Sequence, residues 1–247
     1  GFHEGFVKLD GYYRSDNPWA RTVSPGLWVR YNIGSDNALE DRVIGMNTYW
    51  QFGHRVWSFM KLEHNGELVE HRDDDDVLLG TQWMEATEFY LSVGSSTWRW
   101  VSMKTGIGLG QTPIRDSDLW ADAGRDEPFL GWYYAPNAAI ELRPTSYMRI
   151  ELDYAHSMFF DGPHGALLGD QPRLRGEFQV FFNRDWNLRH ISQWTGSNQQ
   201  VTNDTLLSYT PMPGTVVFAG YRQTDSLDNS EPVERSVFFK GSLLFDF

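Results

Sequence analysis

The sequence has no cysteine, no long hydrophobic run and too few basic residues to balance its acidic ones. Without cysteine, the chain cannot form a disulfide framework, a thiolate metal site or a cysteine nucleophile. It carries 21 basic and 33 acidic side chains, for a net charge of −12, which argues against a general nucleic-acid binder because phosphates require a basic face. The longest apolar stretches, such as 216–219, fall far short of the roughly 20 residues that a membrane-spanning helix needs.

Aromatic residues, by contrast, are abundant. They make up 15% of the 247 residues, with 11 Trp, 11 Tyr and 16 Phe, and the hydrophobic content of 40% is too high for a disordered chain. A soluble core rarely holds so many tryptophans, so these rings require another environment. Because the sequence begins at Gly1 without methionine, we expect either that a targeting segment was removed or that the chain is cut from a longer one.

Strict alternation of apolar and polar residues recurs along the chain, whereas helical spacing is rare. In 148–154, every second residue is apolar, and the residues between them are Arg149, Glu151 and Asp153. Successive side chains of a strand point to opposite faces, so such a segment has one apolar and one polar side. The same pattern is found in 43–52, 101–109, 175–183 and 235–247.

Thirteen segments are candidate strands, and the connections between them alternate in length. The strands are expected near 5–13, 25–34, 42–53, 55–65, 85–95, 97–109, 129–143, 146–157, 173–183, 186–196, 203–211, 214–224 and 235–247. Short turns are expected at Gly53-His54, Ser95-Ser96, Pro144-Thr145, Arg184-Asp185 and Met212-Pro213. Long loops are expected near 66–84, 110–128, 158–172, 197–202 and 225–234.

Tight turns at one rim and long loops at the other are typical of an outer-membrane barrel. We therefore predict an all-β protein: an antiparallel transmembrane β-barrel of about 12–14 strands, with short periplasmic turns and long extracellular loops, as a single domain over 1–247. The C-terminus agrees, because Leu243, Phe245 and Phe247 alternate there and resemble the signal by which bacterial barrel proteins are recognised by their assembly machinery. Ser242 stands where that signal often has glycine.

An odd count of thirteen strands does not close such a barrel. Single-chain bacterial barrels have even strand numbers and both termini in the periplasm, and an unpaired edge in lipid leaves backbone groups unsatisfied. Either 5–13 is not a membrane strand, which leaves a 12-stranded barrel, or the chain is the C-terminal part of a larger barrel.

A family resemblance bears on this choice. Gly5-Phe6-Val7, the turn segment 210–218, Gly220-Tyr221 and the aromatic last strand together resemble a bacterial outer-membrane family of unknown function. In that family a carbohydrate-binding family 9-like domain precedes a C-terminal barrel. The resemblance, strongest over 203–247, implies that this chain is the later part of such a barrel and that the sugar-binding-like domain is absent. The family has no settled activity, so no functional residue is transferred.

The polar face is the first candidate site, because in a barrel it would line the interior. Its mixed charges fit either a lattice of structural salt bridges or the wall of a selective pore. The candidate lumen-lining residues are Arg99, Lys104, Arg149, Glu151, Asp153, Arg175, Glu177, Arg189 and Lys240.

Tryptophans near strand ends form the second candidate site. Indole rings prefer the headgroup region of a membrane, so two interface girdles would account for them, and a sugar-stacking platform is the alternative. The candidate girdle residues are Trp28, Trp50, Trp57, Trp98, Trp100, Trp132, Trp186 and Trp194.

Two weaker candidates remain. The run Asp73, Asp74, Asp75 and Asp76 could bind Ca²⁺, although it lacks the ordered spacing of an EF-hand and fits a solvated charge run better. His190-Ile191-Ser192 resembles the His-x-Ser arrangement of outer-membrane phospholipases, whose catalytic pair also faces lipid. The residues after Ser192 depart from that pattern, and no third catalytic residue can be assigned.

These observations predict a bacterial outer-membrane protein, either a passive pore or a scaffold whose outer loops bind a partner, rather than an enzyme. The alternatives are a secreted glycan-binding β-sandwich and a lipid hydrolase that uses His190 and Ser192. No cofactor and no nucleic acid are expected. The expected partners are outer-membrane lipid and either other envelope proteins or a missing N-terminal segment of the same protein.

Overall fold

The computed structural model describes residues 3–17, 19–34, 39–72, 78–115, 119, 123–212, 214–227 and 232–243. Most of these residues belong to strands of one antiparallel sheet. A short 3-10 helix, η1 (Gly53–Arg55), lies between two of the strands. No helix in the described ranges is long and apolar enough to cross a membrane.

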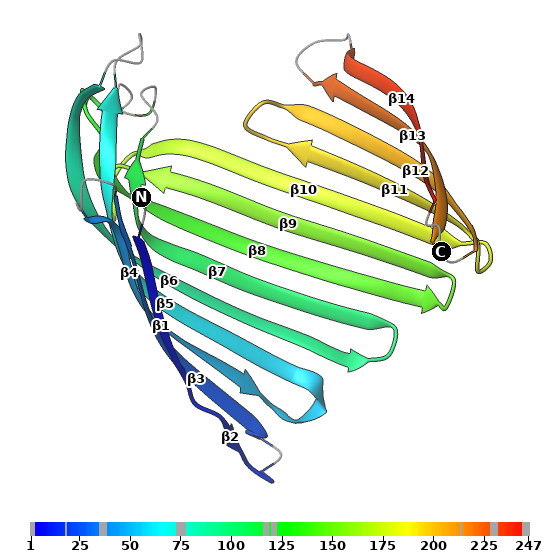
Figure 1. The fold of residues 1–247 in the computed structure, drawn as a ribbon, viewed down its shortest axis with the longest axis horizontal. Coiled ribbons are helices and arrows are strands. Elements are labelled where there is room, and N and C mark those ends of the chain that lie inside the picture. The colour runs from blue at the N-terminus through cyan, green and yellow to red at the C-terminus, as the bar shows by residue number, and fades with distance from the viewer. Residues whose placement is uncertain are drawn as a thin grey trace. The chain divides into compact units, whose positions relative to one another are not determined.

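The sheet has 14 strands, which pair in chain order except for β2 (Figure 1). They are β1 (His3–Asp10), β2 (Tyr13–Arg14), β3 (Thr22–Ile33), β4 (Leu39–Gln51), β5 (Val56–Arg72), β6 (Leu78–Trp98), β7 (Val101–Ile114), β8 (Phe129–Thr145), β9 (Met148–Phe160), β10 (Leu167–Phe181), β11 (Trp186–Thr195), β12 (Gln200–Met212), β13 (Thr215–Ser226) and β14 (Pro232–Leu243). β2 pairs with β3, and the order of the other strands begins at β1 and ends at β14.

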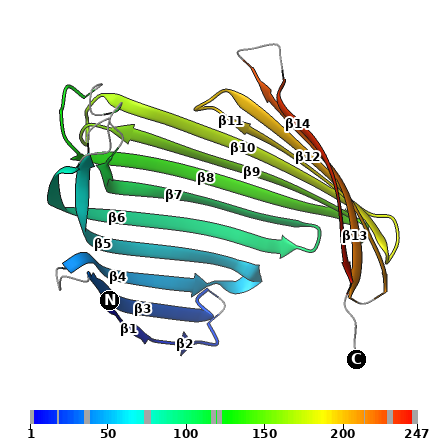
Figure 2. The same ribbon diagram turned by 45° about the horizontal axis from the view of Figure 1, so that its top comes forward.

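The chain divides into two compact units. Unit 1 comprises 1–95, 105–136 and 157–170, and unit 2 comprises 96–104, 137–156 and 171–247. Within unit 1, β1, β3, β4 and β5 lie side by side in that order (Figure 2). Within unit 2, β10 to β14 do the same.

Each of the thirteen strands predicted from the sequence is present, so the all-β antiparallel fold is confirmed. The first predicted segment, 5–13, overlaps β1, which ends at Asp10 and pairs with β3 along its whole length. β2 is an additional strand that the alternation did not predict, because two residues are too few to show a period.

The largest difference concerns 66–84, which the sequence predicts to be a long loop. β5 instead continues to Arg72, and β6 begins at Leu78, with Glu67 directly opposite Met84. Backbone hydrogen bonds of a hairpin do not depend on side-chain hydropathy, so the strands continue where the apolar alternation fades. For the same reason, β9 and β10 extend into the predicted loop 158–172.

Two of the turns differ from their predicted positions by a few residues. The turn predicted at Ser95-Ser96 lies at Arg99-Trp100, because β6 continues beyond Ser95 to Trp98. The turn predicted at Pro144-Thr145 lies at Ser146-Tyr147. The connection at Arg184-Asp185 is confirmed. These short connections all join strands at one end of the sheet, since alternate connections of an antiparallel sheet share an end.

Directly opposed residues of neighbouring strands share a face of the sheet, so the register separates two faces. In unit 1, Met46 lies opposite Leu62, whereas the preceding residue Gly45 lies opposite Glu63 on the other side. We call these the apolar face and the polar face. In unit 2, the apolar face includes the opposed pair Leu188 and Leu207, and the polar face includes the opposed pair Arg189 and Leu206.

The apolar face is exposed to the surroundings. Leu9 in unit 1 is 68% exposed, and Phe239 in unit 2 is 79% exposed. The buried core of the described residues is small: Ile114 and Phe129 form its one cluster, and the side chains packed against them are Leu119, Ala123, Phe159 and Leu168. Exposed apolar area of this extent favours an apolar environment over water.

Candidate functional site

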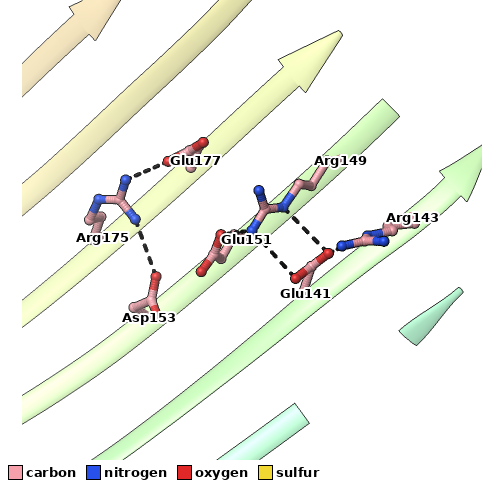
Figure 3. A network of polar contacts seen from close by, with 7 residues as sticks. All are labelled: Glu141, Arg143, Arg149, Glu151, Asp153, Arg175 and Glu177. Carbon is pink, nitrogen blue, oxygen red and sulfur yellow. Dashed lines mark hydrogen bonds and ion pairs between the residues drawn. The ribbon is translucent and has the colours of Figure 1, made fainter. Parts of the chain in front are cut away.

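Charged side chains on the polar face of unit 2 form two groups across β8, β9 and β10 (Figure 3). In the first group, the Arg149 guanidinium lies between two carboxylates. Its Nη2 is 2.8 Å from Glu151 Oε2, and its Nε is 3.4 Å from Glu141 Oε1. Arg143 also pairs with Glu141. The Glu141 carboxylate is therefore shared by two arginines.

The second group is centred on Arg175. Its Nη1 is 3.4 Å from Asp153 Oδ2, and its Nη2 pairs with Glu177 on the same strand. The Glu177 side chain is only 11% exposed. A carboxylate that is so shielded from water depends on its partner, because an uncompensated buried charge is costly.

A third ion pair joins β12 and β13. Arg222 lies directly opposite Asp204 and donates two hydrogen bonds to its carboxylate, from Nε at 2.7 Å and from Nη2 at 3.1 Å. This fork geometry is the strong form of an arginine–carboxylate pair. The polar face of unit 2 thus carries pairs of opposite charge on β8, β9, β10, β12 and β13.

Most of the sequence-predicted lumen residues lie on this polar face. They are Arg149, Glu151, Asp153, Arg175, Glu177, Arg189 and Lys240. Lys104 lies in β7, and its assignment to this face stays a prediction. Arg99 is not on this face, because it lies in the turn between β6 and β7. Whether the face lines a lumen stays a prediction. Sequence reasoning missed the paired residues Glu141, Arg143, Asp204 and Arg222. These residues follow the same alternation, but which residues they pair with depends on the register between neighbouring strands.

The candidate girdle tryptophans divide between the two faces. On the apolar face lie Trp50, Trp186 and Trp194, each at or next to one end of its strand. Trp132 lies near the start of β8. Trp98 ends β6, and Trp100 lies in the following turn. Trp83 also lies on the apolar face, and its Nε1 donates to Glu85 at 3.3 Å. No alternating pattern singled it out in the sequence.

Trp28 and Trp57 lie on the polar face instead. Trp28 is directly opposite Gly45, in the row that continues to Glu63. Trp57 is directly opposite Gly94. Each ring lies over its glycine, since a Cβ on either glycine would come within 2.4 Å of the indole. We therefore do not assign these two rings to a lipid-facing girdle, and the girdle stays a prediction for the others.

His190 and Ser192 lie on the apolar face of unit 2. His190 Nδ1 is within hydrogen-bond distance of Thr205 Oγ1, at 2.9 Å, on the strand directly opposite. Ser192 lies opposite Asn203 on one side and Gly176 on the other. Among the described contacts, no hydrogen bond joins His190 to Ser192.

Several predicted features lie outside the described residues. They are the run Asp73, Asp74, Asp75 and Asp76, the turn residue Pro213, and Phe245 and Phe247 of the assembly signal. Leu243 is the last residue of β14, and its side chain is likewise not described. In the described ranges, no group of three or more His, Asp or Glu side chains could hold a metal ion.

Among the solved structures that resemble this chain is a "CymD monoaromatic hydrocarbon channel", at 10% sequence identity and a TM-score of 0.40, covering 98% of this chain and 84% of that one. No protein-family model matches the sequence. No curated protein matches it.

Proposed function

We propose that this chain forms the wall of a transmembrane β-barrel in the outer membrane of a Gram-negative-type cell and acts as a passive pore. The observation that carries this proposal is the separation of the two faces by register. Apolar side chains occupy one face and paired charges occupy the other, as in Leu188 and Leu207 against Arg222 and Asp204. A barrel wall requires this arrangement, since one side contacts lipid and the other water.

The length of the apolar face along the strands supports its contact with a bilayer. On β4 the apolar face runs from Trp50 through Met46 and Ile44 and becomes charged at Arg42, which pairs with Glu85 at 2.5 Å. Trp50 and Arg42 are eight positions apart, which is about 27 Å of strand at roughly 3.4 Å per residue. A strand tilt of about 40° reduces this to about 21 Å, close to the apolar band of about 25 Å in outer-membrane barrels.

Aromatic rings at the strand ends fit the two interfaces of such a band. Trp186 stacks on Tyr209, with ring centroids 4.4 Å apart, at the β11 end next to the short turn 182–185. Trp194 lies eight positions further, near the other end of the strand. Indole and phenol rings favour the headgroup level because one edge is polar and the body is apolar. Outer-membrane lipid would then contact the apolar face between these rings.

The polar face supports a water-filled interior. The side chains of Arg149 and Arg175 remain partly exposed, at 36% and 30%. Partly exposed arginines in ion pairs suit a hydrated wall, because water shares the cost of holding their charges. We also propose that other envelope proteins bind at the loop ends, and we assign no residue to this contact.

Two measurements test the proposal. Membranes of the expressing cells are extracted with salt, carbonate and then detergent, and the protein is expected only in the detergent fraction; recovery in the salt wash would contradict a membrane wall. The purified protein is then added to a planar bilayer at 1 M KCl. We expect discrete conductance steps, absent from a heat-denatured sample. A protein that inserts but conducts nothing would contradict the pore and leave a scaffold.

A further inference from the structure

The polar face of unit 1 contains a cavity of about 500 Å³ that plays no part in the ion-pair network of unit 2. Side chains of six strands, β1 and β3 to β7, line it. Its size is within the range of small-molecule sites, which measure about 300–1,000 Å³.

Like charges lie directly opposite one another in this cavity. Asp41 of β4 is opposed to Glu67 of β5, and Glu63 of β5 is opposed to Glu88 of β6. All four residues line the cavity. Directly opposed like charges destabilise a sheet, so two such pairs together indicate a place where a positive charge is favoured.

The cations nearby do not cancel these carboxylates. Lys61 Nζ is 2.6 Å from Glu63 Oε2, and Arg115 pairs with Glu67. Arg30 and Arg42 also line the cavity. Arg30 has no partner among the described residues, whereas the charge of Arg42 is balanced by its pair with Glu85. Four carboxylates against Lys61, Arg115 and Arg30 leave one negative charge, which a monovalent cation would balance.

Two hydrogen-bond acceptors in the cavity are unused. Asp41 Oδ1 and Asn65 Oδ1, together with the donor Arg42 Nε, are shielded from water and have no hydrogen-bond partner in the protein. The other carboxylate oxygen of Asp41 accepts a bond from Asn32 Nδ2 at 2.6 Å. A shielded acceptor without a donor is costly, so these two oxygens favour a ligand that carries N–H groups.

Aromatic rings complete the lining. Phe6 of β1 and Trp28 of β3 contribute to one side of the cavity, and the Trp28 ring is held in place over Gly45. Ring faces attract cations and also contact an apolar stem. A bare metal ion would use neither ring, and the described carboxylates do not converge as a metal site.

We propose that this cavity binds a small monovalent organic cation, with an ammonium, amidinium or guanidinium group on an apolar stem. The charged head contacts Glu63, Glu88 and the free oxygens of Asp41 and Asn65, and the stem lies against Phe6 and Trp28. Binding of this kind does not require that the protein conducts, so the proposal stands apart from the pore.

The test uses the purified protein in detergent and isothermal titration calorimetry with benzamidine, an aromatic amidinium. Benzamide, which has the same shape and no charge, is the matched ligand control. We expect saturable binding of benzamidine that is about tenfold tighter than that of benzamide, since hydrogen bonds to a charged group contribute more than neutral ones. Equal binding of the two ligands, or no saturable benzamidine binding at millimolar concentration, would overturn the proposal.

Variants then locate the site. Glu88→Gln removes a cavity carboxylate and should weaken benzamidine binding about tenfold, whereas Asn65→Asp adds one and should strengthen it. Glu234→Gln, on the polar face of β14 in unit 2, should leave the affinity unchanged. Migration of unheated samples on a gel verifies that each variant is folded. An unchanged affinity in both cavity variants, or complete displacement of benzamidine by equimolar Ca²⁺, would also contradict an organic-cation site.

Discussion

Trp28 lies directly opposite Gly45 across the β3–β4 pair, and its indole ring fills the space that a side chain at position 45 would occupy. A Cβ built on Gly45 would be 2.2 Å from Cζ2 of that ring. Three further glycines face an aromatic ring directly across a strand pair in the same way, and these pairs are Gly5 with Tyr31, Gly94 with Trp57, and Gly220 with Phe238. The repeated pairing explains part of the aromatic content without reference to lipid.

The first prediction concerns this close approach. Gly45→Ala should lower the free energy of unfolding by about 1–3 kcal/mol, because a methyl group cannot fit unless the indole moves. The urea midpoint of the protein in detergent micelles, followed by tryptophan fluorescence, measures the effect. In a Trp28→Ala background the same substitution should cost little, so the double-mutant cycle should show coupling.

Gly80→Ala is the matched control, because a Cβ at Gly80 has nothing within 4 Å. It should change the urea midpoint only slightly. An equal loss of stability at positions 45 and 80 would mean that the glycine requirement is not set by the indole.

The second prediction concerns the ion pairs of the polar face. Arg175→Ala leaves Glu177, whose side chain is 11% exposed, without its partner, and also removes the contact to Asp153. We expect a destabilisation of about 1–2 kcal/mol in the same urea experiment. Arg184→Ala is the control, because Arg184 is 92% exposed in a turn and its pair with Asp185 should contribute less than about 0.5 kcal/mol. A similar loss in both variants would contradict a specific role for the half-buried pair.

The fold could be predicted largely from the sequence, because alternation reports which side of a strand faces an apolar surrounding. That signal identified all thirteen strands that pair in chain order. It failed where apolar side chains occupy both faces, as at Leu68 and Val69 in β5, since strand pairing continues there without an alternation to mark it. Loop lengths near 66–84 were overestimated for this reason.

The candidate site could be predicted only in part. Alternation identified the face of Arg149 and Arg175, whereas the partner of Arg222 depends on the register between β12 and β13, which no single segment encodes. Trp28 illustrates a signal that was present: Leu27 and Val29 flank it, so its own phase is that of the polar face. Its assumed position near a strand end instead predicted a lipid-facing ring, because that criterion does not consider which face of the strand the residue occupies.

The third prediction concerns the lipid hydrolase that the sequence left open. Since the His190 imidazole is engaged by Thr205 on the neighbouring strand, we expect no hydrolysis of a fluorescent phospholipid that depends on Ser192. The measurement compares the purified protein with its Ser192→Ala variant in mixed micelles. Hydrolysis by the unmodified protein that disappears in Ser192→Ala would contradict this expectation and restore the enzyme hypothesis.

The last prediction uses two adjacent leucines that the register assigns to opposite faces. Leu207 lies on the apolar face between Leu188 and Ala219, whereas Leu206 lies on the polar face opposite Arg189. If the apolar face contacts lipid, Leu207→Glu should reduce the free energy of folding into liposomes by about 2 kcal/mol, because a carboxylate in the apolar band is poorly solvated. Leu206→Glu differs by one position and should have little effect or a stabilising one, since Arg189 is then its neighbour. Folding yields of the two variants in phospholipid vesicles, read from unheated gels, decide the matter: equal yields would contradict both the face assignment and the membrane wall that depends on it.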